Sequence, residues 1–481
     1  MQDKLTIEKF LKNSPRKLID YENKIIRKAF EYAKYAHRNH KRVSGDPYFL
    51  HCYCTGKTLL EMNIDTETIA AGLLHDTVED TSVKKEDIKK RFGSDVASLV
   101  DGVTKLGKIK YRGAERHAEN LRKMFFAMAE DIRVILIKFA DRLHNMQTLE
   151  VLKPEKRERI ALETMEIYAP IAHRLGMGEF KGILEDLSFK YVYPKEYIWL
   201  IEKSKDKYKD MEKNLEKIEK ILKKELSKNN IEPISIHTRL KYLYSLYKKL
   251  QKYDMNFNKI YDIAAIRIIV NDEEDCYATL GIIHKMWKPL PGRIKDFISM
   301  PKPNGYQSLH TTVFSPQGKM IEIQIRTEKM HEEAENGIAA HWAYSEQGKP
   351  AKGSFVDQGK FSWIKQLKEW QNNTSGNEEF IESLKIDFFK DRIFTLTPTG
   401  DVIDLPENAT PIDFAFEIHT DVGFSCAGAI VNEKMVSLDT PLKSGDVVEI
   451  ITNKNKRPTK DWVDMVKTSH ARQKIRSFLK K

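Results

Sequence analysis

The stretch Gly292–Thr327 constrains the fold of this chain more than any other part of the sequence. Its last residues alternate between an apolar set and a polar set, namely Ile321, Ile323, Ile325 and Glu322, Gln324, Arg326. Because successive side chains of a β-strand point to opposite faces, this alternation predicts a strand with one buried face and one polar face. An earlier alternating run, Leu309–Phe314, is separated from it by a turn that contains proline and glycine. The two runs are therefore predicted to form a β-hairpin.

The loop before this hairpin, Met300–Tyr306, carries residue types that suit a nucleotide. Its two prolines stiffen the backbone, and Gly305 allows another group to approach the backbone closely. Lys295 and Lys302 offer cations for phosphate groups, and Tyr306 offers a flat ring for a base. Singly, such side chains are typical of any half-exposed strand or loop. Together with the carboxylate on the neighbouring strand, they favour a site for a nucleotide and its metal ion.

Composition limits the remaining possibilities. With 481 residues, of which 41% are hydrophobic and 31% are charged, the chain is long enough for about three packed domains. The sequence has no run of about 18 apolar residues and no apolar signal core, so we expect a cytoplasmic protein without a membrane span. The net charge of +11 fits anionic partners such as nucleotides, tRNA or the ribosome. The four scattered cysteines are expected to be free thiols: Cys52, Cys54, Cys276 and Cys426.

Residues 21–195 show apolar residues at helical spacing and contain a second group of chemically suggestive side chains. His51 is followed by the segment LLHDTVEDT, which holds His75 and Asp76, and much later by FADRLHNMQT, which holds Asp141. Two imidazoles and two carboxylates can bind a divalent cation such as Mn2+ and leave positions open for water and phosphate. Each residue alone is equally compatible with an ion pair on a helix surface. Their joint occurrence on apolar helices favours the metal site.

The region 231–345 begins with a group of side chains that suit phosphate. Its segment Thr238–Lys241 is predicted to open a helix, on which Lys241, Ser245 and Lys249 would lie four residues apart on one face. Two cations and a hydroxyl in such a row can follow a triphosphate. The sequence therefore predicts a phosphate-binding helix at this point.

The apolar run that follows, Asp262–Val270, is predicted to be a buried strand. Arg267 lies within this run, and an arginine there is costly unless it is paired or stacked. Strict alternation would put Asp262 and Arg267 on opposite faces of the strand. Either Asp262 precedes the strand or a β-bulge intervenes, and the sequence leaves both possibilities open.

The segments RIKD, PNGYQSLHTTV and IEIQIRT, together with HDTVEDT and ADRLHNMQT, resemble the RelA/SpoT homologue family, whose members make and break the alarmones ppGpp and pppGpp. The resemblance extends from about residue 25 to residue 481. It implies a multidomain α+β protein with an all-α HD-type hydrolase domain, an α/β nucleotidyltransferase-like synthetase domain and a β-grasp TGS domain.

The same resemblance, together with shifts in composition, sets the expected domain boundaries. The predicted parts are an N-terminal segment 1–20, a hydrolase domain 21–195, a connecting helix 196–230, a synthetase domain 231–345, a linker 346–388, a TGS domain 389–453 and a basic helical tail 454–481. An apolar stripe from Tyr208 to Leu226 makes the connecting segment an amphipathic helix, and we hypothesise that it lets occupancy of one site disfavour the other. Longer family members continue beyond such a tail into helical, zinc-finger and ACT modules, so this chain either is truncated or lacks them.

For the hydrolase domain, the resemblance implies a role for each motif residue. Mn2+ would be bound by His51, His75, Asp76 and Asp141. The residues that position or activate water beside the attacked phosphate would be Glu79 and Asp80, and the nucleotide contacts would be Arg42 and Asn145. Three positions depart from the family pattern, with Val43, Cys52 and Gln147 in place of the usual lysine, proline and arginine. The two lost cations are expected to weaken nucleotide binding, and the metal ligands are untouched.

For the synthetase domain, the resemblance implies that Arg239 and Arg267 sandwich the adenine of ATP. The ATP phosphates would be held by Lys241, Ser245 and Lys249, and Mg2+ by Asp262 and Glu322. Tyr306 would stack on the guanine of the acceptor, surrounded by Lys295, Lys302, Asn304, His310 and Gln324. Glu322 would also act as general base on the 3′-hydroxyl of the acceptor. The basic RIKD segment accompanies bifunctional family members that lean towards GDP.

The expected function is therefore that of a bifunctional alarmone enzyme in the stringent response to amino-acid starvation. One site would transfer pyrophosphate from ATP to the 3′-hydroxyl of GDP or GTP and release AMP. The other would hydrolyse (p)ppGpp to GDP or GTP and pyrophosphate. In the TGS domain, His419 would contact the CCA end of uncharged tRNA and so link the chain to the ribosome, although a TGS domain can also be a spacer without a ligand.

Two other classes of protein share parts of this pattern. A nucleotidyltransferase fused to an HD domain, acting on tRNA ends or proteins, would usually carry Gly-Ser followed by an Asp-x-Asp pair, and this sequence lacks that combination. A non-catalytic regulator of tRNA or the ribosome would have decayed sites. The intact acids argue against decay, because a buried unpaired carboxylate has no structural benefit. Turnover of ATP plus GDP separates the enzyme from the regulator.

Overall fold

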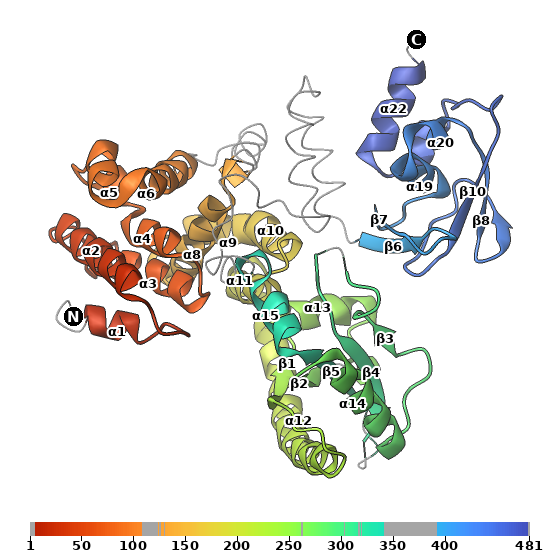
Figure 1. Cartoon of the computed structure of the whole chain (residues 1–481), viewed down its shortest axis with the longest axis horizontal. Coiled ribbons are helices and arrows are strands. Elements are labelled where there is room, and N and C mark those ends of the chain that lie inside the picture. The colour runs from red at the N-terminus through yellow and green to blue at the C-terminus, as the bar shows by residue number, and fades with distance from the viewer. Residues whose placement is uncertain are drawn as a thin grey trace. The chain divides into compact units, whose positions relative to one another are not determined.

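The computed structural model describes residues 5–107, 124, 127–128, 130–260, 263–302, 304–315, 318, 320–340 and 392–479. These residues belong to two compact units, one up to residue 340 and one from residue 392, and each is described by itself (Figure 1). In the first unit, a helical part is followed by a part built on a mixed sheet. Among the residues described, no helix combines the length and the apolar character that crossing a bilayer requires.

The helical part of the first unit is organised around helix α4. Its elements are α1 (Ile7–Leu11), α2 (Asp20–Ala36), α3 (Phe49–Glu61), α4 (Thr66–Leu74), α5 (Thr77–Asp80), α6 (Lys85–Gly107), α8 (Arg133–Gln147), η2 (Leu149–Val151), α9 (Pro154–Glu163), η3 (Thr164–Tyr168), α10 (Ala169–Arg174) and α11 (Gly178–Val192). Helix α4 is buried almost throughout, because its residues are small or apolar on nearly every side. It packs against α2, α3, α6 and α8. A side chain at the end of α4 therefore lies at the centre of this part.

The second part of the first unit is built on one mixed sheet. Its elements are α12 (Pro194–Lys228), β1 (Ser235–Leu240), α13 (Leu243–Lys252), η4 (Phe257–Lys259), β2 (Ala264–Val270), α14 (Glu273–Met286), β3 (Lys295–Asp296), β4 (Leu309–Phe314), β5 (Met320–Thr327) and α15 (Glu328–Asn336). The strand order is β1-β2-β5-β4-β3, and β2 runs parallel to β5 while the other neighbours are antiparallel. The predicted hairpin is confirmed, since β4 and β5 pair antiparallel along their length.

One face of this sheet is apolar and supplies the core. The three isoleucines of β5 are buried there together with residues of β2, β4 and α14. Helix α12 contributes the stripe that the sequence predicts for a connecting helix, and four of its residues are buried in the same core: Leu215, Ile218, Leu222 and Leu226. Burying a leucine or isoleucine stabilises a fold by about 1.5–3 kcal/mol. Packing against the sheet therefore accounts for the stripe, and its role in coupling the two sites stays a prediction.

The opposite face of the sheet is polar, and the strand register gathers predicted site residues on it. Arg267 of β2 lies opposite Gln324 of β5, which in turn lies opposite His310 of β4. Glu322 of β5 and Arg239 of β1 flank the same residue of β2. Cross-strand partners point to the same face of a sheet. The five side chains, which come from four strands, therefore share one surface.

The prediction that Thr238–Lys241 opens a helix is wrong. The segment lies in β1 and just after it, and helix α13 begins at Leu243. The helix starts there because Asp186, on the distant helix α11, accepts hydrogen bonds from the first two backbone N–H groups of α13, at 3.0 and 2.9 Å. Such a carboxylate satisfies N–H groups that have no partner within the helix. Of the three predicted phosphate-binding residues, only Ser245 and Lys249 therefore lie on the helix.

A close backbone contact joins the two parts of the first unit at the start of α11. The backbone N–H of Ile338 donates a hydrogen bond to the carbonyl of Leu175, at 2.9 Å. Gly337 has a φ of +55°, and a β-carbon on it would lie 2.2 Å from that same carbonyl oxygen. Only glycine fits such a position without displacing the backbone. The turn between α10 and α11 is therefore held directly against the end of α15.

The second unit consists of small sheets covered by helices. Its elements are β6 (Arg392–Leu396), β7 (Val402–Pro406), α19 (Pro411–Ile418), α20 (Thr420–Phe424), β8 (Cys426–Val431), β9 (Lys434–Val436), β10 (Val448–Thr452), α21 (Trp462–Met465) and α22 (Ser469–Leu479). One sheet has the order β10-β8-β9, and the other pairs β6 with β7. The buried carboxylate of Asp413 accepts hydrogen bonds from the backbone N–H groups of Lys467 and Thr468. The basic tail is therefore held against α19 by hydrogen bonds to Asp413.

Candidate functional site

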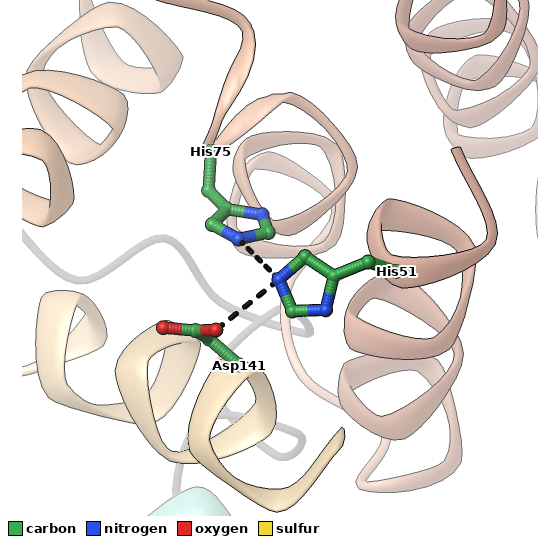
Figure 2. Close-up of side chains that lie close together, drawn as sticks. All are labelled: His51, His75 and Asp141. Atoms are coloured by element: carbon green, nitrogen blue, oxygen red, sulfur yellow. Dashed lines mark hydrogen bonds and ion pairs between the residues drawn. The ribbon is translucent and has the colours of Figure 1, made fainter. Parts of the chain in front are cut away.

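Helices α3, α4 and α8 bring three predicted metal ligands together (Figure 2). His51 lies on α3, His75 directly follows α4, and Asp141 lies on α8. The Nε2 atom of His51 is 3.2 Å from Nε2 of His75 and 3.2 Å from Oδ1 of Asp141. All three side chains are buried, and one ligand atom of each lies within 4.8 Å of the other two. Two imidazole nitrogens and a carboxylate oxygen at this spacing fit a divalent metal ion.

The fourth predicted ligand, Asp76, lies at the junction of α4 and α5. Its Oδ2 atom is 3.1 Å from Nε2 of His75 and 3.4 Å from Nε2 of His51. The hydroxyl of Tyr48 donates a hydrogen bond to the same oxygen, at 2.8 Å. All four residues proposed from the sequence as one ligand set therefore lie side by side. Tyr48, which holds Asp76 in place, was not singled out from the sequence.

Hydrogen bonds to the outer nitrogens orient the two imidazoles. Nδ1 of His75 lies 2.8 Å from the carbonyl oxygen of Gly72, which can only accept, so Nδ1 carries a hydrogen and Nε2 faces the cluster, where its lone pair becomes available once Nε2 loses its proton. Nδ1 of His51 lies 2.8 Å from Nδ1 of His144. Burial and nearby positive charge lower the pKa of His144 to about 3, so this ring is neutral and can accept. Sequence reasoning missed His144, although its position one helical turn after Asp141 was a usable signal.

The charged groups of this cluster shift one another's pKa. Burial opposes a charge on His75, but Asp76 and Asp141 outweigh burial and raise the pKa of His75 to about 9. Burial alone would raise the pKa of Asp76 and of Asp141. The histidines outweigh burial at Asp76 and Lys138 outweighs it at Asp141, so the pKa of each carboxyl lies well below its usual range. Nζ of Lys138 is 2.6 Å from Oδ2 of Asp141. Because a metal ligand must be deprotonated, metal binding here would release a proton from His75.

The predicted nucleotide contacts lie beside this cluster. Nη2 of Arg42 donates a hydrogen bond to Oδ1 of Asn145, at 2.7 Å. The amide of Asn145 in turn donates to Asp141. Glu79 and Asp80 are exposed on α5, directly after the fourth ligand. The arrangement therefore offers exposed acids and a guanidinium group next to the cluster of predicted metal ligands, three of which are buried.

The three departures from the family pattern have different surroundings. Val43 is 77% exposed, and Gln147 is also exposed. Cys52 is fully buried on α3. Val43 and Gln147, which stand where the family usually has a cation, therefore face solvent. A cation at such a position would contact a ligand and would not support the fold. Weaker nucleotide binding through loss of these cations stays a prediction.

A chain of hydrogen bonds crosses the polar face of the sheet to Glu322. The hydroxyl of Tyr306 lies 2.7 Å from Nε2 of His310, and Nδ1 of His310 lies 2.9 Å from Oε1 of Glu322. Gln324 donates to the same carboxylate oxygen, at 3.3 Å. Burial lowers the pKa of His310. A neutral ring therefore fits this chain if it accepts from the tyrosine at Nε2 and donates from Nδ1 to the carboxylate.

The loop that contains Tyr306 closes on itself. The backbone N–H of Lys302 donates to the carbonyl of Tyr306, at 3.1 Å, and Gly305 between them has a φ of +79°. Nζ of Lys302 lies 5.0 Å from the centre of the tyrosine ring. The amide of Asn304 donates to the carbonyl of His173 in the helical part, at 3.4 Å. The loop therefore presents a ring and a cation together, as predicted, and the hydrogen bond from Asn304 attaches it to the helical part.

Three arginines on the polar face converge on Glu335 of α15. Nη1 of Arg267 and Nη2 of Arg326 each lie 2.8 Å from Oε1 of Glu335, and Nη1 of Arg239 lies 3.9 Å from it. Arg267 is 4% exposed and Arg326 is fully buried. This ion pairing offsets the cost of placing Arg267 in a buried strand. Sequence reasoning predicted two of these arginines and missed Glu335, because the carboxylate comes from a helix later in the chain.

Glu335 also contacts a second acid, Glu179, at the start of α11. The hydrogen bond between the two carboxyl groups, together with burial, raises the pKa of Glu179 to about 7. Burial opposes a charge on Glu335 as well, but Glu179 and the arginines outweigh it and lower the pKa of Glu335 to about 2. Near neutral pH, Glu179 therefore carries the proton of this pair for much of the time, and the pair links α11 to α15.

A pocket of about 250 Å³ lies between the polar face and α11. Five predicted site residues line it: Arg239, Lys241, Ser245, Glu322 and Gln324. The helical part contributes further lining residues that the sequence did not single out, namely His173, Gly178, Lys181, Gly182 and Glu185. Lys249 is not among the lining residues, and Lys295 lies at the sheet edge on β3. Asp262, predicted as a metal ligand, lies outside the described residues.

His419, the predicted tRNA contact, begins helix α20 in the second unit. Its side chain is 66% exposed, and its Nδ1 accepts a hydrogen bond from the backbone N–H of Asp421, at 3.2 Å. The exposed ring is fixed at one edge and open to solvent at the other. Contact with tRNA stays a prediction.

Comparison with known protein families identifies three regions in order along the chain. An HD domain matches residues 29–178, the region found in RelA / SpoT proteins matches residues 238–349, and a TGS domain matches residues 392–452. The order of these regions agrees with the three-domain architecture predicted from the sequence, and that fold class is confirmed.

Individual relatives are similar along nearly the whole chain. It is 49% identical over 477 residues to a guanosine-3′,5′-bis(diphosphate) 3′-pyrophosphohydrolase of Aquifex aeolicus, and 48% identical over 460 residues to a GTP pyrophosphokinase of Myxococcus xanthus. It is 46% identical over 458 residues to the bifunctional (p)ppGpp synthase/hydrolase SpoT of Escherichia coli. These alignments cover 99%, 95% and 95% of this chain and 66%, 60% and 65% of the relatives. By sequence and by the order of its domains, the chain belongs to the RelA/SpoT family.

Proposed function

We propose that this chain is a bifunctional enzyme that both makes and hydrolyses (p)ppGpp in the stringent response to amino-acid starvation. The observation that carries the proposal is that one chain holds both a cluster of His51, His75 and Asp141 with Asp76 beside it, and a polar sheet face on which His310 contacts the carboxylate of Glu322. The printed names of the relatives, which include the synthetase, the hydrolase and the bifunctional enzyme, support it.

Synthesis would take place in the pocket on the polar face. Arg239 and Arg267 would hold the adenine of ATP, and Lys241, Ser245 and Lys249 its phosphates. The acceptor, GDP or GTP, would lie against the ring of Tyr306, with contacts from Lys295, Lys302, Asn304, His310 and Gln324. These assignments place the donor and the acceptor on either side of Glu322, which lines the pocket.

In the chemical step, Glu322 would accept the proton of the acceptor 3′-hydroxyl as its oxygen attacks the β-phosphorus of ATP. The bond between the α- and β-phosphates breaks, pyrophosphate is transferred, and AMP leaves. Nδ1 of His310, 2.9 Å from Oε1 of Glu322, holds the carboxylate in place for this transfer. Mg2+, held by Asp262 and Glu322, would supply positive charge to the phosphates.

Hydrolysis would take place at the cluster on α3, α4 and α8. His51, His75, Asp76 and Asp141 would hold Mn2+, which supplies a more acidic bound water when it is present. Glu79 and Asp80 would accept the proton of the attacking water, and Arg42 and Asn145 would hold the nucleotide. The bond between the 3′-oxygen and the pyrophosphate breaks, which yields GDP or GTP and pyrophosphate.

The domain boundaries follow the same assignment. We propose the hydrolase domain at 21–195, the connecting helix at 196–230, the synthetase domain at 231–345 and the TGS domain at 389–453, with the linker 346–388 and the tail 454–481. The exposed ring of His419 supports contact of the TGS domain with uncharged tRNA, and through it with the ribosome. A basic chain with no membrane-spanning helix among its described residues is compatible with a cytoplasmic enzyme.

The test is chromatography of the purified chain after incubation with ATP and GDP in Mg2+, and separately with ppGpp in Mn2+. We expect ppGpp and AMP from the first mixture, and GDP and pyrophosphate from the second. The variant Glu322→Gln should lose only the first reaction, and His75→Ala/Asp76→Ala only the second. If neither mixture reacts, the bifunctional assignment is wrong and binding of tRNA becomes the function to test.

A further inference from the structure

Helix α11 presents one face to the synthetase pocket. Gly178, Lys181, Gly182 and Glu185 line the pocket. The adjacent residues Lys181 and Gly182 each lie three or four residues from Gly178 and from Glu185, which is the spacing of one helical face. The helix is continuous with the helical part, and the HD family match ends at residue 178, where it begins. A wall of the pocket is therefore supplied from outside the region that matches RelA / SpoT proteins.

The position of this wall is fixed by packing on both sides of the pocket. A β-carbon on Gly182 would lie 2.1 Å from the ring of Tyr242, so the helix and this tyrosine are in direct contact. One turn further along, Asp186 accepts the two hydrogen bonds that begin α13. Tyr242 lies directly after Lys241 and α13 carries Ser245, so α11 is tied to the segment with the proposed phosphate contacts. Lys181 therefore faces these residues across a distance that the fold sets.

The pocket has an excess of positive charge on this side. Its charged lining residues are three cations, Lys181, Arg239 and Lys241, and two carboxylates, Glu185 and Glu322. Glu185 is in turn shared, because its oxygens lie 3.7 Å from Nζ of Lys181 and 3.1 Å from Nζ of a further lysine on α13. An anionic ligand would balance this charge and gain from a cation held in place before binding.

Further cations lie near the same corner of the pocket. His173 lines the pocket. Desolvation lowers its pKa to about 3, and the positive charges of Lys181, Lys302, Arg174 and Lys248 act in the same direction. These four cations give the corner a positive potential. A polyphosphate is the ligand whose charge matches it.

We propose that Lys181 is a binding residue for the polyphosphate of the nucleotide donor, supplied to the synthetase pocket by helix α11. The inference rests on the proposed function, in which Lys241 and Ser245 hold the phosphates of ATP. Lys181 would bind these phosphates from the opposite wall, so that the donor is held between the sheet part and the helical part. Its ammonium group would contact the donor, while the acceptor is held by the residues around Tyr306.

The experiment compares two lysines of the same helix in the full chain. Lys181→Met removes the charge that faces the pocket and keeps the length of the side chain. Lys190→Met is the matched control, because Lys190 lies nine residues later, about two and a half turns away on the opposite side of the helix. Its Nζ lies 4.7 Å from the ring of Tyr191, and it does not line the pocket. Thermal unfolding of both variants checks that each remains folded.

The first readout is affinity for α,β-methylene ATP in Mg2+, because this analogue cannot release AMP. We expect about tenfold weaker binding for Lys181→Met, an unchanged value for Lys190→Met, and partial recovery for Lys181→Arg. Affinity for GDP and the rate of ppGpp hydrolysis should stay unchanged in all three. Unchanged analogue affinity in Lys181→Met would overturn the inference, and a loss confined to GDP would overturn the assignment to the donor.

A second readout separates this inference from the proposed function. The unsubstituted chain is tested for formation of ppGpp from ATP and GDP. If it forms none, the proposed function fails whatever the variants do. If it forms ppGpp and the KM for ATP of Lys181→Met equals that of the unsubstituted chain, only the assignment of Lys181 fails. A raised KM for ATP at an unchanged KM for GDP supports both.

Discussion

The two candidate sites differ in how their charges are held. In the helical part, the histidines and aspartates contact one another directly and are centred on the buried end of α4. On the sheet, the polar side chains are spread over four strands and are bordered by α11 and α15 around a pocket. In the proposed function, the first arrangement would be completed by one small ion, whereas the second would receive two nucleotides. A metal cluster can therefore be specified by a few short motifs, while a pocket depends on elements far apart in the chain.

The largest expected effect tests whether the two sites act independently. Glu322→Gln removes the proposed general base, and general-base catalysis contributes about 10²–10⁴-fold to a rate. Synthesis of ppGpp should fall by about that factor, while hydrolysis of ppGpp stays within about twofold. Both rates are measured by chromatography. Glu328→Gln, an acid at the exposed start of α15, is the control that should change neither rate.

A smaller effect is expected when the carboxylate that balances the arginines of the sheet is removed. Glu335→Gln leaves Arg267 and Arg326 without their shared carboxylate, and loss of one partner of a buried ion pair costs about 3–5 kcal/mol. We expect weaker protection of β2 and β5 in hydrogen exchange. The double variant Glu335→Gln/Arg326→Met should regain part of the loss, because it removes one uncompensated charge. Equal protection in all forms would mean that Glu335 does not hold the arginines.

The corresponding test in the helical part changes a residue behind the metal ligands. His144→Phe removes the hydrogen-bond partner of Nδ1 of His51, and loss of such a partner typically weakens metal binding about 10–100-fold. Calorimetry should give a weaker affinity for Mn2+, and excess Mn2+ should restore hydrolysis of ppGpp. Synthesis should be unaffected. Unchanged Mn2+ affinity would show that His51 needs no such support.

The smallest expected effect is a pH dependence at the contact between α11 and α15. The pKa of Glu179 is raised to about 7 from an ordinary value of 4.5, so its proton stabilises the folded state. This contribution to the free energy of unfolding is fully present below about pH 4.5 and is lost as the pH rises through 7. Glu335 acts with the opposite sign, but its lowered pKa of about 2 confines its effect to acid below this range.

Glu179→Gln imitates the protonated form at every pH. Its melting temperature should equal that of the unsubstituted chain near pH 5 and exceed it increasingly towards pH 8. The groups facing Glu179 that contribute to this balance are Glu335, Arg239, Arg267 and Tyr242. If the melting temperatures of Glu179→Gln and of the unsubstituted chain changed in parallel from pH 5 to pH 8, Glu179 would be excluded as the titrating group. A melt of Lys190→Met at the same pH values controls for general effects of substitution on α11.

Local patterns in the sequence were sufficient for much of the molecule. The alternation in Leu309–Phe314 and in Met320–Thr327 predicted both the hairpin and which of its faces is polar. The hairpin follows from side-chain periodicity, which a short segment carries by itself. The joint occurrence of His51, His75, Asp76 and Asp141 on apolar helices favoured a cluster of metal ligands, and the structure brings these four side chains together.

Other features required contacts that no short segment carries. The helix expected at Thr238 begins instead at Leu243, because its cap comes from Asp186. The partner of Arg267 is Glu335, and the partner of His51 is His144, and both pairs form only when separate elements are packed together. The same applies to the pocket wall on α11. Sequence reasoning assigned that helix to one domain and had no signal that it faces another.

The shared position of α11 determines where this chain can be divided. A fragment that begins at the predicted connecting helix, residue 196, would lack the pocket face with Lys181 and the cap that Asp186 provides to α13. It would also lose the contact between the turn before α11 and Ile338. A fragment that keeps all of these contacts must start before Leu175, inside the segment that matches the HD family. If the proposed function holds, the part of the chain needed for synthesis is longer than the region that matches RelA / SpoT proteins, and the two activities share α11.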